Sequence, residues 1–433
     1  MSNHNHQPLS VADWGLYLFA LGAWLNRSLA VVGCAMIVAG LLIDRHRYSS
    51  QGSDAPVVRA LYWWLAGIVL TTSIALFTDS GNAKQHLEAA SRFALLGFFV
   101  PVGMVIGAST SKLQRVMALA TVGFVAARLE HPETAQIKGQ DWLDLSDRLG
   151  LGLPPLALGA LSAFLLLAIL VFLPRLIQQS TDRRYRATVV LLALAFAAAL
   201  AECLLVSLSR GAWLAISTSL VALIIIQLIN NRRAGLLALT IVLITAAVVV
   251  LPARDAIVNR VSAESEQFEQ LINAEFDDIT AGHGQGHKHS VGSRVVMIRE
   301  ALDLWTQRPL FGHGPAAPEL SMRNSDNPFL RYYSDFHNAI LNILVGYGVL
   351  GLVLFLAPPM LTLWAFSRRT KASSALADVR LFVGLSVWML VLSAVLNYRL
   401  LNYDWRFWYW LVLGTAYGFA FRRDDQRGIE STS

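Results

Sequence analysis

Long apolar segments recur along the whole chain, each bounded by a short polar cluster. The runs lie near 10–25, 28–43, 57–77, 90–108, 112–128, 153–174, 187–206, 211–229, 234–251, 337–366, 379–397 and 405–421. Backbone polar groups cannot stay unpaired inside a lipid bilayer, so each run must fold as a helix. The pattern predicts an all-α polytopic membrane protein of about 12 transmembrane helices.

The composition is typical of an integral membrane protein. Hydrophobic residues make up 55% of the 433 residues and charged residues only 15%, with a mean hydropathy of +0.50. Soluble domains carry about 25% charged residues, so we expect membrane lipids as partners and no nucleic acid. The first ten residues lack the basic region and cleavage site of a signal peptide, which predicts that the first apolar run is retained.

Basic residues gather in alternate connections between the apolar runs. One set of connections contains Arg45, Arg47, Lys112, Arg115, Arg175, Arg183, Arg184, Arg186, Arg232, Arg233, Arg368, Arg369, Lys371, Arg422, Arg423 and Arg427. By the positive-inside rule this set faces the cytoplasm, together with both termini. The expected parts are an N-terminal bundle of about nine helices at 1–251, a periplasmic loop domain at 252–336, about three helices at 337–421 and a cytoplasmic tail at 422–433.

The long segment at 252–336 has three parts. Residues 254–279 have an amphipathic pattern that predicts a helix on the membrane or on the bundle. A Gly/His-rich stretch, GHGQGHKHS, follows. Ser293 then begins a predicted helix through Trp305, which Pro309 and the turn-forming glycines after it would end.

Several arginines break the positive-inside pattern. Arg210 lies on a very short external turn between two spans, while Arg399 and Arg406 flank the last span. The planar guanidinium fork matches phosphate oxygens, so a phosphate diester or pyrophosphate at the membrane surface is the expected ligand. The alternative is that these arginines pair with Asp404, Asp335 or lipid headgroups.

Three motifs follow one another on this predicted membrane face. They are SLSRGAWLA, SR-x(10)-W-x(3)-PLFGHGP and HNAILNILVGYGVLGL. Together, over roughly residues 205–355, they resemble the O-antigen ligase (WaaL-type) family, whose signature module is shared with O-antigen polymerases and bacterial protein O-oligosaccharyltransferases. The resemblance implies a GT-C-like fold and assigns function to Arg210, Arg294 and His337. Arg299, further along the same predicted helix, is the alternative to Arg294.

The resemblance also implies the reaction. The donor would be O-antigen on undecaprenyl pyrophosphate, and the acceptor a sugar hydroxyl of lipid A-core on the periplasmic face of the bacterial inner membrane. Arg210 and Arg294 would stabilise charge on the pyrophosphate. His337 would take the acceptor proton or bind the pyrophosphate, two roles that stay open. Direct displacement would invert the anomeric centre. The further residues expected near the substrate are Arg299, Asp335, Arg399, Arg406 and Tyr333.

The chain lacks the Asp-x-Asp pair with which nucleotide-sugar transferases commonly hold a divalent cation. We therefore expect neither a metal nor another cofactor, with arginines in place of the metal. The tract that contains His283, His287 and His289 is the opposing signal, since imidazoles close together can bind zinc. A solvated loop is the favoured interpretation of that tract.

Other features have simpler interpretations. We expect His313 to be a turn residue, and Gly346, Gly348 and Gly351 to permit close helix packing. The aromatic residues predict an interfacial belt; they are Tyr332, Tyr333, Phe336, Tyr347, Tyr398, Tyr403 and the run from Trp405 to Trp410.

Three other functions stay open at this stage. A polymerase or a protein O-oligosaccharyltransferase would use a similar arginine-histidine site with another acceptor. A lipid-linked-glycan transporter would carry charges or helix breakers near mid-bilayer and show repeat symmetry. Only Glu202 and the Pro358-Pro359 pair fit the transporter, and no repeat is visible. The sequence does not indicate which oligomeric state the protein has.

Overall fold

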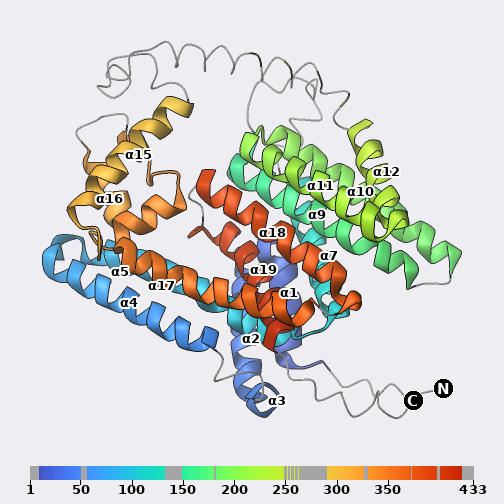
Figure 1. The fold of residues 1–433 in the computed structure, drawn as a ribbon, viewed down its shortest axis with the longest axis horizontal. Coiled ribbons are helices and arrows are strands. Elements are labelled where there is room, and N and C mark those ends of the chain that lie inside the picture. Colours follow the sequence, from blue (N-terminus) through green and yellow to red (C-terminus); the bar gives the residue numbers. More distant parts are fainter. Residues whose placement is uncertain are drawn as a thin grey trace.

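The computed structural model describes residues 9–49, 56–131, 149–179, 182–247, 290–325, 330–371, 373–396 and 400–421, with four single positions between 251 and 262. This part of the chain is helical and contains no strand, so the all-α prediction is confirmed (Figure 1). The helices up to residue 131 are α1 (Val11–Leu25), α2 (Arg27–Ile43), α3 (Arg45–Ser49), α4 (Pro56–Thr78), η1 (Ser80–Asn82), α5 (Ala83–Ala94), η2 (Leu95–Phe98), α6 (Phe99–Ile106) and α7 (Thr110–Leu129).

Two further groups of helices follow. The first is α9 (Pro155–Gln178), α10 (Arg183–Val206), α11 (Arg210–Asn230) and α12 (Arg232–Thr245). The second is α15 (Ser290–Gln307), α16 (Ala317–Asn324), η5 (Leu330–Tyr332), α17 (Ala339–Thr370), η6 (Ser374–Leu376), α18 (Ala377–Leu396) and α19 (Tyr403–Phe421). Figure 1 shows α15 and α16 on one side of the molecule and α9 to α12 on the other.

Each predicted apolar run coincides with a helix. In the described part, seven helical units are long and apolar enough to cross a membrane: α4, the unit Ser80–Ile106, α9, α10, α11, α17 and the unit Ser374–Leu396. The other predicted spans are α1, α2, α7, α12 and α19, which are shorter or less apolar helices. The multi-pass prediction is therefore confirmed, with seven clear spans where the pattern predicted about twelve.

The first two predicted spans form a tight hairpin. Asn26 ends α1 and caps α2, since its side chain accepts from the backbone N–H groups of Ser28 and Leu29. A Cβ at Gly33 would lie 2.4 Å from the backbone nitrogen of Phe19. Small residues let two helices approach this closely, so packing compensates for the shortness of both helices.

The aromatic belt prediction is wrong for most of its residues. Trp405 and Trp408 on α19 are 1% and 0% exposed, and Phe336 and Tyr347 are also buried. Residues of α19 are buried from Asp404 to Ala420, and α9 is likewise almost wholly enclosed. A helix that is apolar on all sides belongs in a core. The aromatic run therefore fills the centre of the bundle, with no interfacial role.

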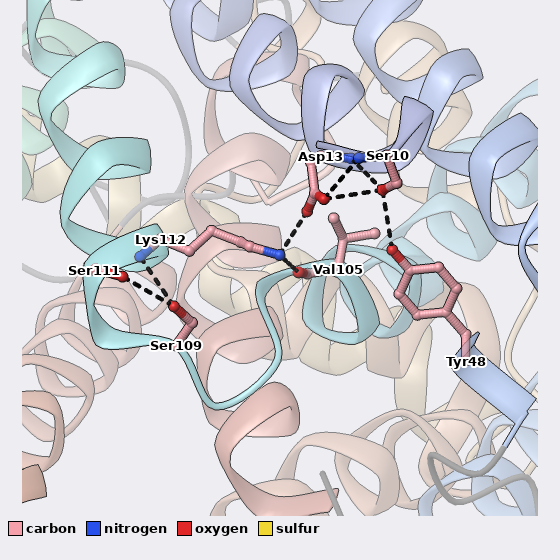
Figure 2. Close-up of polar contacts among 7 residues, drawn as sticks. All are labelled: Ser10, Asp13, Tyr48, Val105, Ser109, Ser111 and Lys112. Atoms are coloured by element: carbon pink, nitrogen blue, oxygen red, sulfur yellow. Dashed lines mark hydrogen bonds and ion pairs between the residues drawn. The ribbon is translucent and has the colours of Figure 1, made fainter. Parts of the chain in front are cut away.

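A buried ion pair fastens the start of the chain to the bundle (Figure 2). The Lys112 ammonium, on α7, donates to Asp13 Oδ1 at 2.5 Å and to the Val105 carbonyl at 2.8 Å. Asp13 also completes a capping box with Ser10, whose hydroxyl lies 3.3 Å from that of Tyr48. These contacts connect α1, α3, α6 and α7.

Several sequence predictions fall outside the described residues. They include the amphipathic helix at 254–279 as a unit, the tract of His283, His287 and His289, Tyr398, Arg399 and the cytoplasmic tail at 422–433. The described part of the predicted loop domain contains α15, which begins at Ser290. Ser293 therefore lies inside the first turn of α15 and does not cap it, because the helix extends three residues further back. The predicted domain boundaries stay a prediction.

Candidate active site

The strongest candidate for a catalytic group is the imidazole of His337, which stands immediately before α17. Asp335 Oδ1 accepts from the backbone N–H of His337 at 2.7 Å and lies 3.0 Å from its Nδ1. A carboxylate only accepts, so Nδ1 carries the proton and Nε2 is the basic nitrogen. The imidazole is 30% exposed and the carboxylate 16%, so both can meet a substrate. The predicted support of His337 by Asp335 has the geometry it requires.

The backbone of His337 has an unusual conformation. Its φ is +52°, a region that residues other than glycine seldom adopt. The Tyr333 ring meets the imidazole edge-on, with centroids 5.2 Å apart and an interplanar angle of 86°. Asp335 and Tyr333 therefore set the direction of the imidazole from two sides.

Buried neighbours hold this loop in place. Phe336 is 1% exposed and belongs to an apolar cluster with Met297 of α15 and Leu341 of α17. On the other side, Asn338 caps α17 by accepting from two backbone N–H groups. Asn342, which is 2% exposed, donates to the Asn338 carbonyl at 2.7 Å. His337 is therefore fixed between two buried anchors.

The two candidate arginines of α15 have different surroundings. Arg294 is half-buried, and Met297 and Ala301, three and seven residues later, are fully buried. This spacing puts the three side chains on one face of the helix, the face packed toward the His337 loop. Arg299 lies on the exposed face. The structure thus favours Arg294 over Arg299 as the loop arginine.

The loop between α15 and α16 fastens α15 to α17. The His313 backbone N–H donates to the Val345 carbonyl at 2.8 Å, and its Nε2 lies 2.7 Å from the Leu304 carbonyl. His313 is therefore committed to structure, as expected for a turn residue. His313 therefore holds Leu304 of α15 close to Val345 of α17. Toward the N-terminal ends of both helices, Met297 and Phe336 belong to one apolar cluster. The N-terminal end of α15, with Arg294, accordingly lies toward His337.

Gly348 has a second role in addition to the close packing that was predicted. It has φ +67° and breaks α17 into two helical pieces at a kink. The next two backbone N–H groups, of Val349 and Leu350, donate instead to the carbonyls of Pro309 and Leu310. The PLFGHGP loop therefore supplies the hydrogen bonds that the kink removes from the helix, and Gly348 serves the kink as well as close packing.

Arg210 is the first residue of α11. The α10–α11 turn is short, as predicted, and Ser209 caps α11 by accepting from the Ala212 N–H. Leu208 takes φ +46° in this turn, and Arg210 itself is exposed. The guanidinium group thus projects from the positive end of a helix dipole, where an anion is stabilised.

Contacts along α9 and α18 relate Arg210 to His337. The start of α9 lies beside the start of α11, because a Cβ at Gly159 would lie 3.0 Å from the Ser209 Cβ. The end of α9 lies beside the start of α18, where Arg175 and Asp378 approach to 3.7 Å. The C-terminal end of α18 is therefore on the side of Arg210.

The His337 loop meets this same end of α18. The Asn338 amide donates to the Val395 carbonyl at 3.1 Å. Further down, Trp388 of α18 donates to Thr218 of α11 at 3.0 Å. A helix rises about 1.5 Å per residue, so Arg210 lies about 12 Å from Thr218 along α11 and Val395 lies about 10 Å from Trp388 along α18. Both residues lie toward the same end of the bundle. The structure thus puts the start of α11 and the His337 loop at one end of α18.

Arg406 occupies a different position from the other candidates. It is 8% exposed on the first turn of α19, and the charged groups that act on it are Arg27, Arg92 and Asp404. Its Nε and Nη1 atoms are buried without a hydrogen-bond partner. A role for Arg406 toward substrate stays a prediction.

A polar cavity of about 400 Å³, which the sequence did not predict, lies between the α4–α5 corner and the α15–α16 loop. His86, which is 1% exposed, lies 3.2 Å from Asp79 and accepts from the Ala316 N–H through Nδ1. Hydrogen bonds from Asn82 and His86 hold the pKa of Asp79 below its usual value. Only the histidine in the amphipathic stretch AKQHLEAASRFA could have indicated this contact.

Comparison with protein families bears directly on this arrangement. Residues 195–356 match the family model described as O-antigen ligase. We call this matched segment the O-antigen ligase domain, after the family that it is similar to. The O-antigen ligase domain includes Arg210, Arg294, Asp335 and His337, whereas Arg406 lies beyond it. Its family consists of glycosyltransferase-like enzymes that act on lipid-linked O-antigen. A comparison with curated proteins gives no significant match.

Within the described residues of the O-antigen ligase domain and its neighbours, no group of three or more His, Cys, Asp or Glu side chains could hold a metal ion. The histidine tract lies outside those residues, so metal-independent chemistry stays a prediction.

Proposed function

We propose that this protein is an O-antigen ligase that transfers O-antigen polysaccharide from undecaprenyl pyrophosphate to a sugar hydroxyl of lipid A-core. The observation that carries the proposal is the His337–Asp335 pair, with its 3.0 Å contact, at the mouth of α17 inside the O-antigen ligase domain. The reaction belongs to lipopolysaccharide biosynthesis, at the periplasmic face of the bacterial inner membrane.

In this mechanism His337 is the general base. Nε2 takes the proton of the acceptor hydroxyl as its oxygen attacks the anomeric carbon of the donor sugar. The bond from that carbon to the pyrophosphate oxygen breaks, and the electron pair leaves with the pyrophosphate. Asp335 stabilises the imidazolium that forms, through its hydrogen bond to Nδ1. A single displacement of this kind inverts the anomeric centre.

Arg210 and Arg294 bind the leaving group. Negative charge grows on the pyrophosphate oxygens in the transition state, and guanidinium donors already aimed at them lower its energy. Arg294 comes from the packed face of α15 and Arg210 from the start of α11. Tyr333 would contact the sugar beside the imidazole, and Arg399 would assist at the membrane surface. No divalent cation is needed in this scheme.

A reconstituted assay tests the proposal. Purified protein is mixed with undecaprenyl-pyrophosphate glycan and lipid A-core in excess chelator, and the products are separated on a gel. A ligase gives glycan joined to lipid A-core, and His337→Ala abolishes the product while the variant keeps its thermal unfolding temperature. Longer lipid-linked glycan without joined product would show a polymerase. Movement of intact donor across a bilayer without any transfer would show a transporter.

A further inference from the structure

An apolar groove begins about one helical turn after Arg210, at Trp213 on α11. It has a volume of about 290 Å³ between α9, α10, α11 and α12, and we name it the α9–α12 groove. Its lining includes Leu166, Ala201, Trp213, Ser217, Leu220, Ile241 and Thr245. The only polar side-chain groups in this set are two hydroxyls and the Trp213 indole, whose N–H donates to the Leu204 carbonyl at 3.0 Å. The groove therefore offers a surface for hydrocarbon.

The groove and Arg210 belong to one stripe of α11. Trp213, Ser217 and Leu220 line the groove, three, seven and ten residues after Arg210. This spacing puts all four side chains on one side of the helix. The distance from Arg210 to Leu220 is about 15 Å along the helix axis, about half of the hydrocarbon core of a bilayer. A ligand in the groove would thus reach about half-way into the membrane.

We infer that the α9–α12 groove binds the first isoprene units of the lipid-linked donor while its pyrophosphate meets Arg210. This inference rests on the proposed function and adds the position of the donor lipid. The charge at the mouth supports an anionic lipid, since Arg210 and the positive end of α11 lie together there. The volume is at the lower limit of ligand pockets, about 300–1,000 Å³, so it suits part of one chain better than a phospholipid with two.

The groove would act mainly by positioning the donor. A hydrocarbon chain moves into the groove from the lipid bilayer, where it is already shielded from water. The favourable binding free energy therefore comes from packing against Trp213 and its neighbours. Holding the first isoprene units against α11 keeps the pyrophosphate next to Arg210. The anomeric carbon is then presented to the side on which the His337 loop lies.

Photo-crosslinking tests this inference without relying on turnover. The full chain in phosphatidylcholine nanodiscs is irradiated with a polyprenyl pyrophosphate that carries a diazirine on its second isoprene unit, and adducts are mapped by mass spectrometry. We expect adducts on peptides that contain Trp213–Leu220 and Ile241–Thr245. Unlabelled polyprenyl pyrophosphate should compete, whereas phosphatidylglycerol should not.

Two variants and a matched control sharpen the test. Ser217→Phe and Ala201→Phe fill the groove from α11 and α10, and each should lower the adduct yield by about fivefold or more because the chain loses its contacts there. Leu214→Phe adds the same ring on α11 at a side chain that is 52% exposed and does not line the groove, so its yield should stay at the wild-type level.

The outcomes separate this inference from the proposed function. Adducts in the groove without any joined glycan product would support the groove and overturn the ligase. Joined product with adducts on other helices, or with competition by phosphatidylglycerol, would overturn the groove and leave the ligase standing. Unchanged adduct yield in both filled variants would also overturn it.

Discussion

At the scale of single residues, the conformation of His337 is the clearest sign of function. A left-handed conformation in a residue other than glycine is unfavourable by about 1–3 kcal/mol, and the surrounding structure has to compensate. Here buried Phe336 on one side and the Asn338 cap on the other provide that compensation. The strained backbone turns the imidazole toward Asp335 and Tyr333.

Replacing Asp335 tests its support of the imidazole. Asp335→Asn keeps the size of the side chain but removes the charge that stabilises the imidazolium. We expect the initial transfer rate to fall by about 10²- to 10⁴-fold, the range of general acid–base contributions. Asp303→Asn, on the outer part of α15, is the control, and an unchanged rate for Asp335→Asn would contradict the role.

Arg294 and Arg299 form a matched pair on one helix. Arg294→Lys keeps the charge but loses the planar fork, and should slow transfer by about 10- to 100-fold, the equivalent of one charged hydrogen bond of about 1.5–3 kcal/mol. Arg299→Lys, on the exposed face, should leave the rate unchanged. Steady-state kinetics with varied donor concentration measure both. Equal losses in the two variants would mean that neither arginine is aimed at the pyrophosphate.

At the scale of elements, the kink in α17 joins the loop domain to the membrane helices. Gly348→Ala should destabilise the protein by about 1–3 kcal/mol, the range for a strained backbone, because φ at this position is +67°. The new Cβ would also lie 2.2 Å from the Leu310 carbonyl oxygen, which adds to the loss of stability. The free energy of unfolding in detergent measures the effect.

The control for this change is Gly384→Ala on α18, where a Cβ would meet nothing within 4 Å. An alanine there should be neutral or stabilising by about 0.5–1 kcal/mol, the difference in helix propensity. If both variants unfolded alike, the kink would not be a strained junction.

The spans could be predicted from the sequence because each long apolar run allows only a helix in lipid. The sequence also predicted the positions of Arg210 at a short turn before α11 and of His337 at the start of α17, whereas their functional roles stay predictions. The position of the aromatic run of α19 was predicted wrongly. A tryptophan-rich helix is compatible with the membrane interface and with a protein core, and only the burial of its side chains in the structure distinguishes these two locations. The kink at Gly348 and the contact of His86 could not be predicted from the sequence, because the kink depends on the PLFGHGP carbonyls and the His86 contact on Ala316, which is far away in the chain.

At the scale of the whole molecule, the bundle includes polar contacts that hold distant segments together. Lys112→Met would leave the Asp13 carboxylate, 2% exposed, without its cation. Removing one partner of a buried pair is unfavourable by about 3–5 kcal/mol, so the unfolding midpoint should drop clearly. Lys84→Met, at a side chain that is 87% exposed, is the control and should change little. A Lys112→Met protein as stable as wild type would show that the pair does not fasten α1 to α7.

The candidate site residues come from both sides of the molecule. The O-antigen ligase domain includes α11 on one side of the molecule and α15 with the start of α17 on the other (Figure 1). Helix α18 contacts both sides, since Trp388 donates to Thr218 of α11 and the Val395 carbonyl accepts from Asn338. A diphosphate held by Arg210 and Arg294 would bridge these two sides. Ligand binding should therefore stabilise the protein as a whole.

The most direct measurement is the position of the donor pyrophosphate on the protein. Electron cryo-microscopy of His337→Ala in nanodiscs with bound undecaprenyl-pyrophosphate glycan would show it. The account predicts phosphate oxygens within about 2.7–2.9 Å of guanidinium nitrogens of both Arg210 and Arg294, with the anomeric carbon facing position 337. A pyrophosphate bound elsewhere, or the two arginines opening into separate compartments, would contradict it.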